Sequence, residues 1–251
     1  MSTQHTLTAP SAGFALTIAL MLTSCGSTSH DAGAPANGLE QATAAAPTAP
    51  AQGASNGTAD AGDFAARTGQ LSNPDNATMV FLYYDLAGIP PPIDDWTERD
   101  NRVQAAPGPD KAARRAQVRG ELAAGMRAVR GVGVLHLAMQ ANLSDYDPTY
   151  SEFTIRALSP SSQVEFDAFG QKVELSFDNA LDAQSWHVPA ADAQNIRDRI
   201  NQHGVQMDLT VKIDNVLPGP AGGTIVARVL HYDLRETNGD TTLARVDVPQ
   251  R

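Results

Sequence analysis

The chain has 251 residues, one cysteine and a formal net charge of −10. This net acidity argues against nucleic acid as a partner, and a single cysteine excludes an intramolecular disulfide. The length suits one large domain or two small ones, provided that the whole chain folds.

An apolar run of nine residues, Phe14–Leu22, lies near the N-terminus. It is too short to span a bilayer core, which needs about 20 residues, and it has the length of the apolar region of a secretory signal peptide. The residues before it contain no Lys or Arg, in contrast to the basic start that such peptides usually have. The run therefore predicts export rather than a membrane span.

The apolar run ends in the sequence Leu22-Thr23-Ser24-Cys25-Gly26. An aliphatic residue three positions before a cysteine, with small residues between, resembles the lipobox of bacterial lipoproteins. The resemblance implies that residues 1–24 are a signal peptide and that Cys25 becomes the acylated first residue of the mature protein. Acyl chains hold a protein on a bilayer at about 0.8 kcal/mol per buried methylene, so a lipid bilayer is an expected partner. Gly26, rather than Asp, at the next position implies the outer membrane, with the protein facing the periplasm.

Residues 25–72, counted from the cysteine, are rich in Ala, Gly, Pro, Ser and Thr and poor in the residues that build cores. Such a composition cannot bury enough apolar surface to offset the entropy of ordering the chain. We therefore expect a disordered tether here, followed by a single folded domain over residues 73–251. That length is enough for a domain with its own core.

The first third of this domain has the pattern of helices. A helix is predicted over 75–87, with Asn73 as its N-cap and Pro74 in its first turn, because apolar residues recur there at helical spacing. A short helix is expected after Asp94-Asp95, and a longer one over 110–129.

Beyond Gly131 the apolar pattern changes to a period of two, most clearly over residues 205–213. Short turns at Gly170, at 218–223 and at Asn238-Gly239 separate several such runs and predict antiparallel neighbours. The predicted strands cover residues 132–141, 152–157, 163–169, 171–177, 205–213, 224–234 and 241–248, with one helix over 190–202 among them. This order predicts an α+β fold with N-terminal helices packed on a mostly antiparallel sheet.

No common catalytic motif is present, and an acylated Cys25 leaves no thiol for catalysis. His136 and His231 lie in predicted strands and could meet across the sheet as metal ligands or as an acid/base pair, although a histidine satisfied in the core or at its rim is the favoured interpretation. His187, after Trp186, is expected to close a core edge. His203 precedes the predicted helix end and complements the helix dipole there.

Carboxylates cluster at Asp94-Asp95 and at Asp145 with Asp147. The first pair could line a cleft and the second could bind a cation, but two carboxylates do not fill a six-to-eight-ligand shell. Helix capping by Asp94 or Asp95, and a turn at Asp145 and Asp147 that ends in Pro148, are the favoured interpretations. We therefore predict no metal site and no cofactor.

The helix predicted over 110–129 and its exit carry a third of the basic residues of the chain. This asymmetry could favour anionic lipid or an acidic partner, although a solvated helix face is the simpler interpretation. The residues are Lys111, Arg114, Arg115, Arg119, Arg127 and Arg130.

The middle of the domain, with Tyr146-Asp147 ahead of Phe153, resembles uncharacterised domains of exported bacterial proteins, a resemblance that implies no activity. The leading hypothesis is a non-catalytic envelope lipoprotein that binds a protein or a wall component through the polar sheet face or the basic helix. Two alternatives stay open: a membrane-anchored hydrolase that uses Asp and His side chains, and a carrier of an apolar ligand held between helices and sheet.

Overall fold

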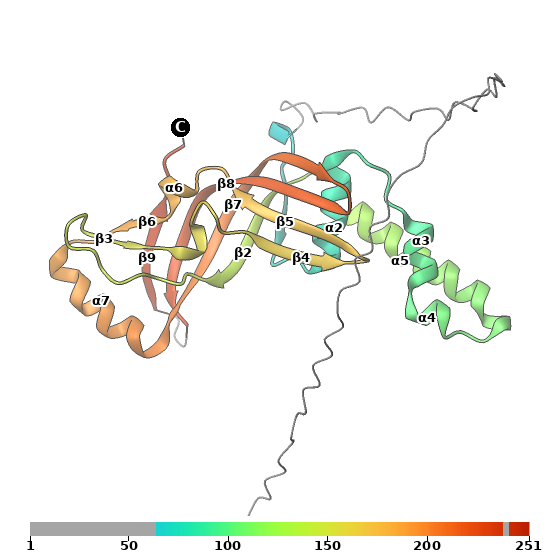
Figure 1. Cartoon of the computed structure of the whole chain (residues 1–251), viewed down its shortest axis with the longest axis horizontal. Coiled ribbons are helices and arrows are strands. Elements are labelled where there is room, and N and C mark those ends of the chain that lie inside the picture. The colour runs from blue at the N-terminus through green and yellow to red at the C-terminus, as the bar shows by residue number, and fades with distance from the viewer. Residues whose placement is uncertain (1–63, 238–240, 251) are drawn as a thin grey trace, which may run out of the picture. The chain divides into compact units, whose positions relative to one another are not determined.

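The computed structural model describes residues 64–237 and 241–250, apart from the side chains of residues 201–203. All of these residues belong to one compact unit, Ser55–Arg251. Cys25, the predicted signal peptide and most of the predicted tether lie outside the described residues. The described residues form helices, mostly N-terminal to the sheet, and one mixed sheet, which is an α+β architecture (Figure 1).

A seven-stranded mixed sheet is the centre of this unit. Its strands are β1 (Gly69–Ser72), β2 (Val132–Gln140), β4 (Val164–Ala168), β5 (Gln171–Phe177), β7 (Val205–Gly219), β8 (Gly222–Glu236) and β9 (Thr242–Asp247). They lie in the order β1-β2-β7-β8-β5-β4, and β9 also pairs with β8. The β4–β5 and β7–β8 pairs are antiparallel, as their short turns predict.

Two pairings are parallel, β1 with β2 and β5 with β8, so the sheet is more mixed than the sequence predicts. The chain between β5 and β7 is long and contains helices, and a crossover of this kind permits a parallel arrangement. No tight turn joins β5 to β8, and the turn chemistry that predicts hairpins therefore says nothing about this pair.

Strand β7 shows the alternation that the sequence predicts. Met207, Leu209, Val211 and Ile213 are all buried, and the polar residues between them are on the opposite face of the sheet. Thr210 is a correction to this prediction, because it is only 8% exposed rather than in water. It lies between His136 and His231 on the neighbouring strands, and their side chains flank it.

Strand β8 is longer than the strands on its other side. Residues 222–227 pair with β5, and residues 231–235 pair with β9. The two short strands therefore follow one another along a single edge of β8, which Figure 1 shows at the centre of the sheet.

Helix α2 (Asn76–Ala87) lies on the sheet and packs against β4, β5, β7 and β8. Its N-cap is Asp75, whose carboxylate accepts a 2.7 Å hydrogen bond from the Thr78 amide, and not Asn73 as predicted. Asn73 instead accepts a hydrogen bond from the amide of Ala138 in β2. The buried Tyr83 hydroxyl donates to the Gly222 carbonyl at 2.7 Å and ties α2 to the first residue of β8.

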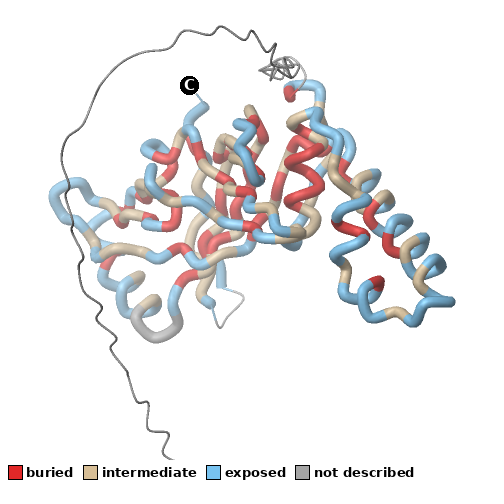
Figure 2. Tube along the Cα trace, turned by 45° about the vertical axis from the view of Figure 1, so that its right-hand side comes forward, coloured by how far each residue is buried: buried red, intermediate tan, exposed pale blue. Residues whose placement is uncertain are grey.

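Three further helices follow: α3 (Ile93–Arg99), α4 (Asn101–Gln104) and α5 (Lys111–Ala128), the last preceded by a short 3-10 turn, Gly108–Asp110. Helix α5 packs mainly on α2, α3 and α4 rather than on the sheet. Trp96 stacks on Phe169 at 4.7 Å between ring centres, which joins α3 to the β4–β5 turn. Figure 2 shows that the other faces of these helices are exposed.

Strands β3 (Glu152–Thr154) and β6 (Ser185–His187) form a separate two-stranded sheet. The strand predicted over 152–157 is confirmed only for Glu152–Thr154, because Arg156–Leu158 form a 3-10 turn. Its partner β6 was not predicted as a strand. Phe153 stacks on Trp186 at 5.3 Å between the two strands, so aromatic packing holds this short pair.

The folded unit begins earlier than predicted. Strand β1 and the buried Phe64 lie within the range 25–72 that was expected to be disordered. Arg67 forms a 2.7 Å ion pair with Asp85 of α2, and the backbone of β1 pairs with β2. Backbone hydrogen bonds to β2 therefore hold this segment, although it has few apolar side chains to bury.

Helix α7 (Ala190–His203) ends at Gly204, as predicted. Gly204 has φ 69°, which glycine adopts without strain, and its amide donates to the Ile200 carbonyl. Among the described residues, no helix is long and apolar enough to cross a bilayer.

Gly133→Ala should detach β1 from β2. A Cβ at Gly133 would lie 2.3 Å from the carbonyl oxygen of Arg67, which is too close for a non-bonded carbon and oxygen, so the backbone would have to shift. We expect the free energy of unfolding, measured by denaturant titration, to fall by about 1–3 kcal/mol. The control is Gly120→Ala in exposed α5, where a Cβ meets nothing within 4 Å and a gain of about 0.5–1 kcal/mol is expected. Equal effects of the two substitutions would contradict the close approach of β1.

Candidate functional site

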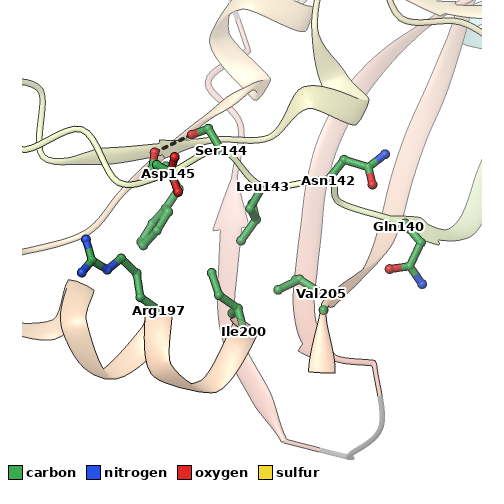
Figure 3. A pocket seen from close by; sticks show the side chains of 10 residues that line it. Gln140, Asn142, Leu143, Ser144, Asp145, Arg197, Ile200 and Val205 are labelled. Atoms are coloured by element: carbon green, nitrogen blue, oxygen red, sulfur yellow. Dashed lines mark hydrogen bonds between the residues drawn. The ribbon is translucent and has the colours of Figure 1, made fainter. Parts of the chain in front are cut away.

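A groove of about 500 Å³ lies between α7 and the segment that follows β2 (Figure 3). One wall is α7 with the start of β7, and the other is the end of β2 with residues 142–145. The lining residues are Gln140, Asn142, Leu143, Ser144, Asp145, Phe153, Arg197, Ile200, Gly204 and Val205.

Helix α7 reaches this position because one of its faces is apolar. Ala193 is buried, and Ile196 and Ile200 pack against the core at helical spacing. Gly204 then turns the chain so that β7 starts at once with the buried Val205. Because this face packs on the core, Arg197, beside the face, and Ile200, at its C-terminal end, are held along the groove.

The opposite wall is a loop held by backbone hydrogen bonds. The Ala141 amide donates to the Val205 carbonyl at 2.9 Å, which connects this wall directly to β7. Ser144 and Thr154 are joined twice, because the Ser144 amide donates to the Thr154 carbonyl and the Thr154 amide donates to the Ser144 Oγ, both at 2.9 Å. The Ser144 hydroxyl also donates to the Asp145 carbonyl at 2.7 Å. This network fixes the backbone that carries Asp145.

Two opposite charges lie on the two walls of the groove. Asp145 on the loop and Arg197 on α7 are at the same end of it in Figure 3. Among the described side chains, the Asp145 carboxylate has no hydrogen-bond or ion-pair partner, and Arg197 has no ion-pair partner and donates one hydrogen bond to the Gln194 side-chain oxygen, at 2.8 Å. Leu143, Ile200 and Val205 form an apolar middle section, and Gln140 and Asn142 are at the other end.

His136 and His231 lie on one face of the sheet and line a second, shallower groove of about 350 Å³. They do not meet, because strand β7 and its Thr210 lie between them. Both ring nitrogens of His136 are engaged: Nδ1 is 3.1 Å from the Thr210 hydroxyl, and Nε2 is 3.2 Å from the Gln70 side-chain oxygen. The arrangement matches a histidine satisfied at the rim of the core.

The other predicted carboxylates and histidines are dispersed. Asp94 is in the first turn of α3 and pairs with Arg119 at 2.7 Å, and the cap of that helix is Pro92, so capping by Asp94 or Asp95 was wrong. Asp147 accepts a 2.8 Å hydrogen bond from the Thr149 amide and so supports a turn, but this turn begins at Pro148 rather than ending there, and Asp145 is outside it. No group of three or more possible metal ligands occurs within the described part of the chain.

The remaining two predicted histidines do not form a site with these carboxylates. The His187 side chain is 73% exposed and lies 3.5 Å from the Glu152 carboxylate, so Trp186 and not His187 closes the core edge. The side chain of His203 is outside the described residues.

The basic helix α5 is partly neutralised by carboxylates of its neighbours. Arg115 pairs with Glu98 at 2.6 Å, and Arg119 pairs with Asp94. The hydrogen bond from Arg115 lowers the pKa of the Glu98 carboxyl, which keeps this pair charged. The α3–α5 interface therefore uses part of the basic face that was considered for a partner.

Arg197, Gln140 and Asn142 were not singled out from the sequence. The helical spacing of Ile196 and Ile200 could have marked Arg197 as a residue beside an inward face, but nothing local connects it to Asp145. A comparison with protein-family models, curated proteins and solved structures found no match to this chain. What the groove does is therefore inferred from its own residues.

Proposed function

We propose that this protein is a cell-envelope lipoprotein, anchored to a bilayer through acylated Cys25, whose α+β domain is a non-catalytic module that binds a ligand in the groove beside α7. The anchor is supported by the signal-like run, the lipobox-like pattern and the position of the one cysteine. The binding role is supported by the shape and chemistry of the groove. The outer membrane, with the protein facing the periplasm, is the proposed location.

The main observation that supports a binding role is a pair of opposite charges at one end of the groove, next to an apolar section. Neither charge has an ion-pair partner among the described residues. Most arginines near the sheet have carboxylate partners, as Arg199 has in Glu236 at 2.5 Å and Arg67 has in Asp85. Asp145 and Arg197 have none within the described residues. Polar and charged groups that converge on a concave surface with an apolar section are a usual composition of a ligand site.

The other surfaces considered from the sequence have charged groups that are partly paired within the domain. Arg115 and Arg119 of the basic helix already have acidic partners, and the polar sheet face carries its own ion pair between Arg235 and Asp208. A hydrolase would need a base beside a nucleophile or a water site. His136 uses both ring nitrogens within the sheet, so a binding role accounts better for the geometry.

Cys25→Ser should abolish metabolic labelling by a fatty-acid probe and release the protein from the membrane fraction, because acyl chains on this residue are the proposed anchor. Fractionation in high salt, with immunodetection, measures the release. Retention of the mutant protein in the membrane fraction at high salt would contradict the proposed anchor.

A photo-crosslinking residue at Asn142 should acquire a ligand adduct in cells, detected by mass spectrometry of the purified chain. The same residue at Lys212, on the polar sheet face, is the matched control and should acquire none. Ile200→Trp, which fills the groove from α7, should remove the adduct at Asn142 while the thermal melting curve shows a folded domain. An adduct at Lys212 with none at Asn142 would contradict the groove as the binding site.

A further inference from the structure

We infer that the groove beside α7 recognises a free α-amino acid with a large aliphatic side chain. This inference rests on the proposed function, that the groove binds a ligand, and adds the chemical class of that ligand. It is drawn from the positions of two charges, one apolar section and two amide side chains along the groove.

The charges select the head group. Asp145 and Arg197 are on opposite walls at one end of the groove, and no ion pair joins them within the described residues. An α-amino acid carries an ammonium and a carboxylate on one carbon, so a single head group between the walls would give each side chain a partner of opposite charge. A guanidinium also offers two parallel N–H donors, which match a carboxylate.

The apolar section selects the side chain of the ligand. Leu143 on one wall and Ile200 and Val205 on the other lie next to the charged end. A side chain that extends from a head group between Asp145 and Arg197 would lie along these residues, and its apolar surface would be buried away from water. The amides of Gln140 and Asn142 at the far end would then face the tip of the ligand or water around it.

The size of the groove is compatible with this class. Its volume of about 500 Å³ lies within the range of roughly 300–1,000 Å³ that is usual for small-molecule sites. The backbone of the Asp145 wall is fixed by hydrogen bonds to Thr154 and Val205, so part of the site is formed before the ligand binds. A preformed site loses less conformational entropy on binding.

The test is isothermal titration calorimetry on the full chain in detergent with L-leucine and three analogues. L-leucinamide lacks the carboxylate, N-acetyl-L-leucine lacks the ammonium, and glycine lacks the side chain. We expect L-leucine to bind most tightly. Loss of either the carboxylate or the ammonium should weaken binding about fivefold, and glycine should bind at least tenfold more weakly than L-leucine.

Two charge variants make the assignment specific to each wall. Asp145→Asn should weaken binding of L-leucine and L-leucinamide about fivefold and leave N-acetyl-L-leucine unchanged. Arg197→Gln should weaken binding of L-leucine and N-acetyl-L-leucine and leave L-leucinamide unchanged. The matched controls are Asp147→Asn, two residues along the same loop, and Arg127→Gln on α5, neither of which lines the groove; both should bind like the parent chain.

Equal binding of all three leucine compounds would overturn the zwitterion inference, yet it would leave the groove as a ligand site. Absence of binding by all four compounds would also overturn it, and the crosslinking experiment at Asn142 would then decide the proposed function by itself. Weakening by Asp147→Asn as large as that by Asp145→Asn would show a general charge effect and would overturn the assignment to Asp145.

Discussion

Strands β7 and β8 pair with each other over fifteen residues each, and the positions of the other elements follow from this hairpin. Val211, Ile213, Ala227 and Val229 are fully buried within it. β2 pairs with β7 along one side, while β5 and β9 divide the length of β8 between them. A hairpin longer than its neighbours leaves its ends free for other contacts. Helix α2 uses one end through the hydrogen bond from Tyr83 to Gly222, and α7 enters at the other end, before Val205.

The groove is a consequence of how that second end is built. β2 stops at Gln140, and the chain turns away through Asn142, whose φ is 50°. α7 arrives on the other side and joins β7 at Gly204. The space between the departing loop and the arriving helix holds side chains from both, and the charged ones have no ion-pair partner in the described residues. Some charges elsewhere in the domain are paired, as Arg228 is with Asp178 and Asp214. Asp145 and Arg197 are exposed, and both are therefore accessible to a ligand in the groove.

Periodic features were predictable from the sequence, and contacts between distant segments were not. The alternation of Met207 to Ile213 and the helix end at Gly204 depend on local sequence, and both predictions were confirmed except at Thr210, which is buried. β1 could not be predicted, because backbone pairing and the missing Cβ of Gly133 hold it, with little help from apolar side chains. Asp145 was noticed as part of a carboxylate cluster, but it lines the groove together with Arg197, far away in the chain, whereas Asp147 does not line it. Only the fold brings those walls together.

Hydrogen–deuterium exchange of the full chain in detergent, measured by mass spectrometry with and without L-leucine, tests the central claim that the groove is the ligand site. The account predicts slower exchange in peptides that cover residues 140–145 and 197–205, the two walls, and no change over residues 111–128 of α5. Slower exchange confined to residues 132–138 and 227–233 would place the ligand on the sheet face near His136 and His231. That result would contradict the account.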